Sequence, residues 1–182
     1  VRHIETMAFN GCEKLDNFTI PPKVTEINES VFTGCKSLKK IFIHSDVENV
    51  ASNAFDGCES LEAFDVSEDN SFLSSDSGVL YDKNKTKLVV IPNAKSGELI
   101  LPDSLKELGD DFTDCRNLTS VYIPKSIHYL SPLSFRGCDS LESIIVSDDS
   151  YDYTSVDGVL YSKDMTEIRA YPGGKKGGFV IP

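Results

Sequence analysis

The fold is decided by the stretch VFTGCKSLKKIFI, residues 31–43, because closely similar stretches recur along the chain. In each copy a Phe is followed three residues later by Cys, then by Leu, and then by two apolar residues separated by one variable position. The Phe residues of the five copies are evenly spaced, except that a longer gap follows the third copy. They are Phe9, Phe32, Phe55, Phe112 and Phe135. The apolar, variable, apolar ending has the period of a β-strand. The sequence therefore predicts a stack of similar short units, each contributing one strand.

The longer gap, between Phe55 and Phe112, holds one long unit and one short unit that lacks a single position of the basic repeat. The long unit includes Ser77–Lys83 and a second apolar run, 88–91, and both return in the second half of the chain at Asp157–Lys163 and 168–171. In each long unit two strand-like runs flank a polar loop. We interpret each as a β-hairpin inserted into the basic repeat.

This pattern resembles the BspA-like branch of leucine-rich repeat proteins. The resemblance lies in the motif Ala-Phe-x-Gly-Cys-x-x-Leu-x-x-Ile-x-Ile-Pro and in the Gly-Val-Leu-Tyr of the inserts, at 78–81 and 158–161, and it covers essentially the whole chain. The commoner leucine-rich pattern places Asn or Cys after the strand. Here the Cys precedes the Leu of the repeat, which is typical of the BspA-like branch.

The expected fold is a β-rich solenoid in the form of a leucine-rich repeat arch. Residues 1–182 would form one domain of about seven repeats, and this domain would be part of a longer array. Seven parallel strands would form a concave sheet: five from short units and two from long units. Because the period is too short for a crossover helix, the convex side would consist of short turns, 3₁₀ segments or short strands. Stacking would bury the apolar side that a single repeat leaves exposed.

All five cysteines lie in the repeated motif: Cys12, Cys35, Cys58, Cys115 and Cys138. A parallel stack separates equivalent Cβ atoms by about 4.8 Å or more, whereas a disulfide needs about 3.5–4.5 Å. Zinc sites use close pairs such as Cys-x-x-Cys, which the sequence lacks. The three histidines occupy unrelated repeat positions, so none is matched to a thiol as a base. We therefore predict that the cysteines are buried packing residues.

The composition disfavours several functions. With 29 acidic and 18 basic residues the net charge is −11, which argues against nucleic acid and anionic membrane surfaces as partners. No apolar run reaches the ~18–20 residues of a spanning helix. No Ser/His/Asp, Cys/His or paired-carboxylate set recurs in the repeat, so we expect no enzymatic activity, no cofactor and no metal.

The residue between the two inward apolar residues of each strand should point outward. Along the stack these outward residues are Thr19, Phe42, Asp65, Ile100, Tyr122, Ile145 and Val180. Several are apolar or aromatic, and a column of such residues forms a patch of the kind that often binds a partner. The candidate protein-binding face comprises Phe42, Asp65, Ile100, Tyr122, Ile145 and Lys40. The alternatives are that strand-forming residues favour these positions for their own sake, or that neighbouring copies cover them.

The resemblance implies a non-catalytic protein-interaction or adhesion module of a cell-surface or secreted protein, with proteins on host or neighbouring cells as partners. The alternative is a passive spacer that presents other domains. The end segments align with the same point of the repeat. We therefore expect either a parent protein that continues on both sides or an isolated chain that associates end to end.

Overall fold

The computed structural model describes residues 1–181, in which strands are joined by turns and no helix of any type occurs. The chain divides into two compact units. Unit 1 comprises Val1–Lys95 with Ser104–Lys106, and unit 2 comprises Ser96–Asp103 with the chain from Glu107 onward. Each unit is a stretch of β-solenoid, as the repeat predicts.

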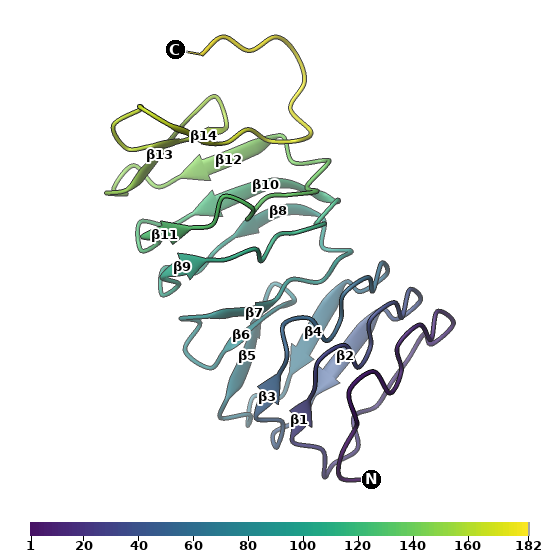
Figure 1. The fold of residues 1–182 in the computed structure, drawn as a ribbon. Helices are drawn as coiled ribbons and strands as arrows, with labels where there is room; N and C mark the ends of the chain where they lie inside the picture. The colour runs from purple at the N-terminus through teal and green to yellow at the C-terminus, as the bar shows by residue number, and fades with distance from the viewer. Residues whose placement is uncertain (182) are drawn as a thin grey trace. The chain divides into compact units, whose positions relative to one another are not determined.

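Unit 1 has two walls of parallel strands (Figure 1). On one wall β2 (Lys40–Ile43) pairs with β4 (Ala63–Val66), and Thr19 extends this sheet through an isolated bridge to Phe42. On the other wall β1 (Glu26–Ile27) pairs with β3 (Asn49–Val50). The expected alternation is present in β2, where Ile41 and Ile43 are buried and their neighbours are exposed.

The core of unit 1 contains a ladder of aromatic rings. Phe32 stacks between Phe9 and Phe55, with ring centroids 5.4 and 5.2 Å away and planes within 12° of parallel. Phe18 and Phe64 meet this ladder edge-on. Equivalent residues of successive repeats therefore contact each other directly, which is how a stacked array obtains its stability.

The insert of unit 1 is larger than the expected hairpin. It is a three-stranded antiparallel sheet of β5 (Leu73–Asp76), β6 (Val79–Asp82) and β7 (Leu88–Val90). The hairpin of β6 and β7 is confirmed, and β5 is added to it. Sequence analysis missed β5 because Ser74, Ser75 and Asp76 are all polar and do not show the alternation of apolar and polar residues that is typical of a strand.

Each insert docks on the last strand of a parallel sheet through a glycine. Phe64 N donates to Gly78 O over 2.9 Å, and a Cβ on Gly78 would lie 2.9 Å from Cβ of Ala63. Gly78 also has φ +82°, which glycine tolerates best. The expected run of seven parallel strands is therefore wrong in detail, since the insert occupies the edge of β4 where another strand would pair.

Unit 2 repeats this plan. Its parallel sheet has the order β12 (Ser143–Val146), β10 (Leu118–Ile123), β8 (Gly97–Ile100). The short strands β9 (Glu107–Leu108) and β11 (Tyr129–Leu130) form the other wall.

The insert of unit 2 is the antiparallel sheet of β13 (Tyr153–Val156), β14 (Val159–Ser162) and β15 (Ile168–Ala170). It docks as the first insert does, with Ile144 N donating to Gly158 O over 2.8 Å. The strand expected at 178–181 does not form.

Turns, not 3₁₀ segments, connect the walls in the described part of the chain. In the motif turn Cys35 N donates to Phe32 O over 3.0 Å, and Gly34 N donates to Asp56 O of the next repeat over 2.8 Å. Gly34 adopts φ +75°, and Asp114 takes the same place in a later repeat with φ +61°. This position of the turn has a left-handed conformation, which glycine tolerates best, and this explains the glycine of the motif.

Candidate functional site

The cysteines are free thiols, and four of the five are buried as expected. The Sγ atoms of Cys35, Cys58 and Cys138 each donate to the carbonyl oxygen of the motif Phe one repeat earlier, over 3.1–3.3 Å. Burial raises the pKa of Cys58 and of Cys115 to about 12 and that of Cys138 to about 11. Such thiols are almost fully protonated at neutral pH and are poor nucleophiles.

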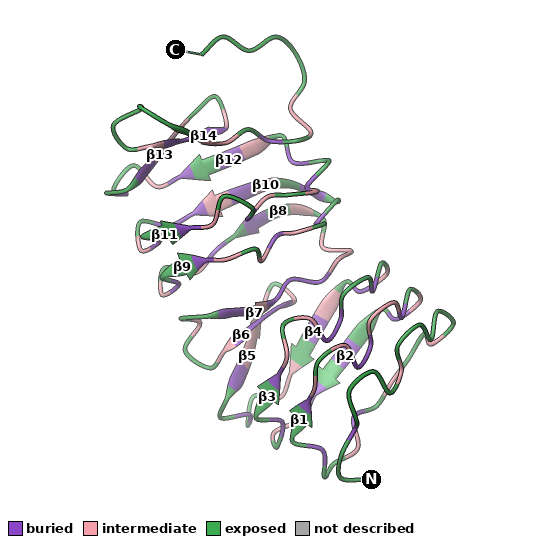
Figure 2. Ribbon diagram, viewed as in Figure 1, coloured by how far each residue is buried: buried purple, intermediate pink, exposed green. Residues whose placement is uncertain are grey.

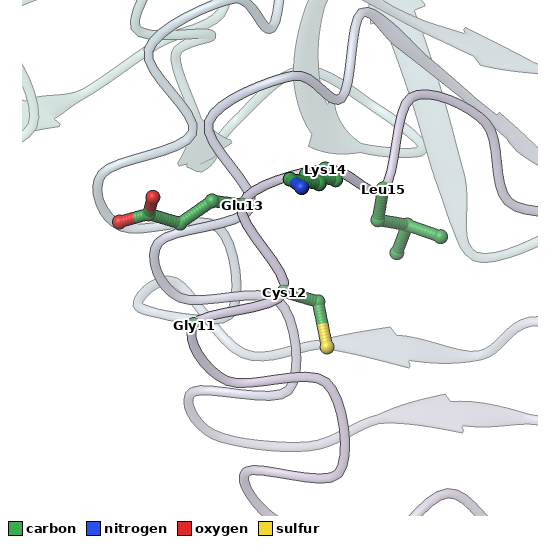
Figure 3. A pocket seen from close by; sticks show the side chains of 5 residues that line it. All are labelled: Gly11, Cys12, Glu13, Lys14 and Leu15. Carbon is green, nitrogen blue, oxygen red and sulfur yellow. The ribbon is translucent and has the colours of Figure 1, made fainter.

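Cys12 corrects the prediction for the fifth thiol, because it is exposed. It lies with Gly11, Glu13, Lys14 and Leu15 along an open hollow at the first repeat, and Figure 3 shows Glu13 pointing away from Cys12 and Leu15. The equivalent Cys35 is buried against the repeat before it, where its Sγ donates to Phe9 O. The hollow is open, and it leaves Cys12 exposed.

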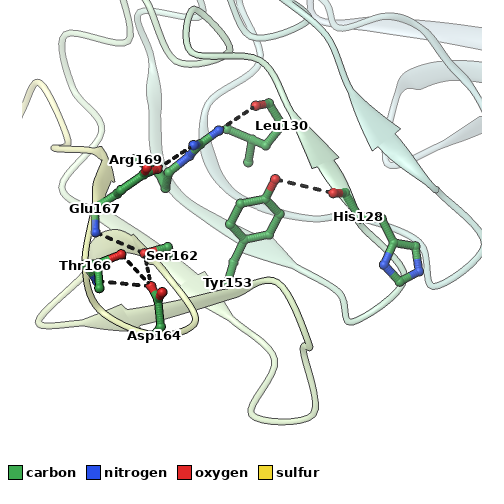
Figure 4. A network of polar contacts seen from close by, with 8 residues as sticks. All are labelled: His128, Leu130, Tyr153, Ser162, Asp164, Thr166, Glu167 and Arg169. Atoms are coloured by element: carbon green, nitrogen blue, oxygen red, sulfur yellow. Dashed lines mark hydrogen bonds and ion pairs between the residues drawn. The ribbon is translucent and has the colours of Figure 1, made fainter.

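Polar contacts in unit 2 hold the second insert in place (Figure 4). Arg169 pairs with Glu167 at 2.9 Å and lies 6.0 Å from the ring centroid of Tyr153. Asp164 accepts bonds from Ser162 Oγ and from Thr166, and these bonds, the one from Ser162 first, lower the pKa of its carboxyl group. Arg169 also donates to Leu130 O and Tyr153 Oη to His128 O, each over 3.5 Å, so the network joins the insert to the preceding repeat.

Another pair in unit 2 is formed by His128 Nδ1 and Asp152 Oδ2, which lie 2.8 Å apart. Both side chains are well exposed, and exposed pairs of this kind contribute little to stability. Over residues 1–181 no three His, Cys, Asp or Glu side chains gather as metal ligands do.

The outward residues of unit 2 form a contiguous apolar row. Tyr122 of β10 lies opposite Ile145 of β12 on one side and opposite Ile100 of β8 on the other. Ile100 is 65% exposed and Ile145 is 40% exposed, while Tyr122 between them is partly buried. We call these three residues the unit 2 row. Parallel pairing in register makes the row a single patch.

The corresponding row of unit 1 differs in chemistry. Phe42 is 51% exposed, but it lies between Asp65 on β4 and Thr19 at the isolated bridge. Lys40 is exposed two residues earlier on β2. The candidate residues of unit 1 therefore form one exposed aromatic ring with polar neighbours. Figure 2 shows buried and exposed stretches within the parallel strands of each unit.

Sequence analysis placed all these outward residues correctly relative to their own strands, but it could not tell which of them meet. Val180, included in the column, lies in a segment that is not a strand. Another missed residue is Asn70, a buried amide at the start of the first insert. The one sequence feature that could have pointed to Asn70 is Ser150, which is also small and polar and occupies the equivalent position before the second insert.

These features define a leucine-rich repeat β-solenoid with exposed rows of residues on its parallel sheets. The family model for the BspA type leucine rich repeat region, with six copies, matches residues 1–96 and 92–171. The chain therefore belongs to that family. Such repeats are generally non-catalytic and are typical of surface proteins and interaction modules.

Three solved structures are similar to the chain. A leucine-rich repeat protein from Eubacterium ventriosum is 27% identical with a TM-score of 0.60, and the match covers 72% of this chain and 42% of that one. The pneumococcal vaccine antigen PcpA is 23% identical with a TM-score of 0.61, covering 72% and 39%. A leucine rich cell surface protein from Faecalibacterium prausnitzii is 24% identical with a TM-score of 0.54, covering 79% and 52%. The match therefore spans less than two thirds of each of these structures.

Among curated proteins none matches the chain. In the described residues no helix has the length and apolar character needed to cross a membrane.

Proposed function

We propose that the chain is a protein-interaction and adhesion module of a cell-surface or secreted protein, and that the unit 2 row makes the contact. The observation that carries this proposal is the pairing of Ile100, Tyr122 and Ile145 across three adjacent strands. Outward positions of a sheet with one solvated face are polar by default. Three apolar side chains in one contiguous row therefore need a reason beyond strand propensity.

The chemistry of the row suits a protein partner. Tyr is enriched among residues that dominate binding energy, and apolar neighbours exclude water from around it. The rest of the surface is strongly acidic, since the chain carries a net charge of −11. The matching partner has an apolar centre and a basic periphery, because complementary charge speeds association and sets orientation.

Phe42 and its neighbours contribute less under this proposal. The ring is flanked by Thr19 and Asp65, so burying it would also dehydrate a carboxylate. Unit 1 therefore offers a matched control at equivalent positions of the repeat.

Binding of the fluorescent chain to intact cultured epithelial cells tests the proposal. We expect saturable binding that is lost when the cells are first shaved with trypsin. Tyr122→Ser with Ile145→Ser should weaken it by about 10-fold or more, as for lost anchor residues. Phe42→Ser should leave it within about 2-fold, because a lone rim residue contributes little. Each variant must keep the circular dichroism and melting temperature of the parent.

Two outcomes would overturn the proposal. Equal binding by the parent and the unit 2 double variant would exclude the row as the contact. Absence of saturable, protease-sensitive binding would favour the spacer function, in which the chain holds other domains at a distance.

A further inference from the structure

A second row of residues lies beside the unit 2 row on the same sheet. Glu98, Ser120 and Ser143 lie opposite one another across β8, β10 and β12, two residues before the members of the unit 2 row. The turn of the insert continues this second row, because a Cβ on Gly158 would lie only 2.8 Å from Oγ of Ser143. Asp157, in the same turn, is exposed. We call Glu98, Ser120, Ser143 and Asp157 the acidic row, since two small hydroxyl residues lie between two carboxylates.

The two carboxylates of the acidic row are available to a partner. In the part of the chain that the structure describes, neither Glu98 nor Asp157 forms an ion pair through its carboxylate. Lys175 Nζ binds the main-chain oxygen of Asp157 over 2.6 Å and leaves the carboxylate unpaired. The equivalent row of unit 1 has Lys40 on β2 and Ser77 in the turn of its insert, with no carboxylate. The two units therefore carry opposite charge at equivalent places.

Tyr122, in the middle of the unit 2 row, also has a polar group to offer. Its hydroxyl makes no hydrogen bond to any other residue within 1–181, although the ring is partly buried. Such a tyrosine gives a partner both apolar area and a hydrogen-bonding group at its tip.

The edge of this sheet at β12 is closed to a partner strand. Ile144 N donates to Gly158 O over 2.8 Å, and Val146 N donates to Ser155 Oγ over 3.0 Å. The insert therefore occupies the amides that a strand added at this edge would need. A partner here meets the side chains of the sheet face and not its main chain.

The spacing of the unit 2 row matches the rise of a helix. Neighbouring strands place its members about 4.8 Å apart. Three or four residues of an α-helix rise about 4.5–6.0 Å, so a helix that crosses the strands brings one apolar side chain to each member of the row. Alternate residues of an extended chain are about 6.6 Å apart, so their side chains no longer align with the row after three strands. The face therefore fits the i, i+3 or i+4, i+7 pattern of an amphipathic helix.

We propose that the unit 2 row binds a basic amphipathic helix of a partner protein, which lies across the strands. This inference rests on the proposed function and names the kind of segment that is bound. The apolar stripe of the helix covers Ile100, Tyr122 and Ile145, and Lys or Arg side chains beside the stripe reach Glu98 and Asp157. Such side chains suit these places, because their aliphatic stems lie along apolar surface while their charged ends meet the carboxylates. Unit 1 repels the same helix through the cation of its equivalent row.

Synthetic peptides test the shape and the charge of the partner separately. The first peptide has about four helical turns, with Leu at i, i+3 or i+4 and i+7 and Lys on one flank of the Leu stripe. A second has the same composition with Leu and Lys alternating, which favours a strand. A third carries Glu in place of every Lys. Fluorescence anisotropy with the full chain should show that the first peptide binds at least about 10-fold more tightly than either control, as for a lost anchor.

Two double variants identify the contact residues. Glu98→Gln with Asp157→Asn removes both charges, and Asn accepts the left-handed φ of +49° at residue 157. It should weaken binding of the helical peptide by about 10-fold at low salt and have no effect near about 1 M salt, where charges are screened within about 3 Å. Tyr122→Ser with Ile145→Ser should weaken binding at both salt concentrations, because it removes apolar contact. Lys40→Glu, the matched change in unit 1, should leave binding within about 2-fold.

A single charge reversal supplies a gain of binding. Glu98→Lys should weaken binding of the Lys peptide and strengthen binding of the Glu peptide, which a change in folding alone would not do. Equal binding of the helical and alternating peptides would overturn the helix, and equal binding of the Lys and Glu peptides would overturn the role of charge. If the row variant loses cell binding while no peptide binds the parent chain, this inference fails and the proposed function stands. If the helical peptide binds selectively while the row variant keeps full cell binding, the proposed function fails and the helix site stands.

Discussion

The thiol of Cys58 donates a hydrogen bond to the carbonyl oxygen of Phe32, 3.1 Å away in the preceding repeat. The same oxygen accepts the N–H of Cys35 over 3.0 Å, so it closes the turn of its own repeat and anchors the next. Cysteine is suited to this place because it is small, apolar and a weak donor. The cysteine ladder therefore links repeats without any disulfide.

Thiol labelling should distinguish one cysteine from the other four. We expect an aromatic disulfide reagent at pH 8 to label about one thiol per chain rapidly, because Cys12 is exposed while burial raises the pKa of Cys35, Cys58, Cys115 and Cys138. All five should react in guanidinium. Cys12→Ser should abolish the rapid phase. Rapid labelling of that variant would show that the buried ladder opens.

Asn70 should be the most costly polar residue to replace. Its Nδ2 donates to His44 O and Val47 O over 2.9 and 2.8 Å, and its Oδ1 accepts from Phe72 N and Leu73 N over 2.8 and 2.7 Å. Asn70→Ala removes all four bonds inside the protein, so urea unfolding should show a loss of about 2–4 kcal/mol.

Ser150 is the matched control for Asn70. It holds the equivalent place in unit 2 and accepts one side-chain bond, from Tyr153 N over 3.3 Å. Ser150→Ala should therefore cost about 1 kcal/mol. Equal losses at the two sites would contradict this account of the amide.

The ion pair of Asp76 with Lys85 should make stability depend on acid pH. The hydrogen bond from Lys85 is the main cause that lowers the pKa of Asp76. A carboxyl group with a lowered pKa stabilises the fold above its unfolded pKa, and this stabilisation is lost as pH falls through the folded value. Asp76→Asn should therefore reduce stability at pH 7 and have no effect near pH 2.

The effect should be small, below about 1 kcal/mol, because both partners are still partly exposed to solvent. In unit 2 the equivalent residues are Val156 and Met165. The double variant Asp76→Val with Lys85→Met should accordingly unfold within about 0.5 kcal/mol of the parent. A loss of several kcal/mol would show that the first insert needs this charge pair.

Asp111 should show the opposite pH dependence. Burial raises the pKa of its carboxyl group, and the bond that Oδ2 accepts from Gly109 N over 2.6 Å offsets part of this increase. The folded chain then holds the proton more tightly, so this carboxyl group costs stability at neutral pH and ceases to do so as pH falls through its folded pKa. Asp111→Asn keeps an acceptor for Gly109 and should raise the neutral melting temperature. A melting temperature that falls instead would contradict this.

The repeat spacing was enough to predict the fold class, since alternation fixes which residues of a strand face inward. Ile41 and Ile43 are buried and Phe42 is exposed, as expected. The division of the parallel strands could not be predicted, because it depends on a glycine contact between segments distant in sequence. Gly78 stands in the turn between the paired strands β5 and β6, where it packs against Ala63.

Prediction of the candidate binding face from the sequence has a similar limit. The alternation identified Tyr122 and Phe42 as outward residues of equal standing, and nothing in the local sequence separates them. Their neighbours differ only once register is known, with Ile145 beside Tyr122 and Asp65 beside Phe42. Exposure of Cys12 was missed because the sequence treats the five copies of the motif as equivalent, whereas the structure buries only four of the five cysteines.

The docking of Gly78 and Gly158 has a consequence for how such a protein changes its length. Gly78 and Gly158 are equivalent residues of two successive blocks of the larger repeat. Each block carries its own insert, and with it the glycine that closes the edge of its parallel sheet. Unequal recombination between blocks can add or remove one of them without leaving a bare strand edge that invites aggregation. The number of blocks can thus change while each parallel sheet keeps its own closing glycine.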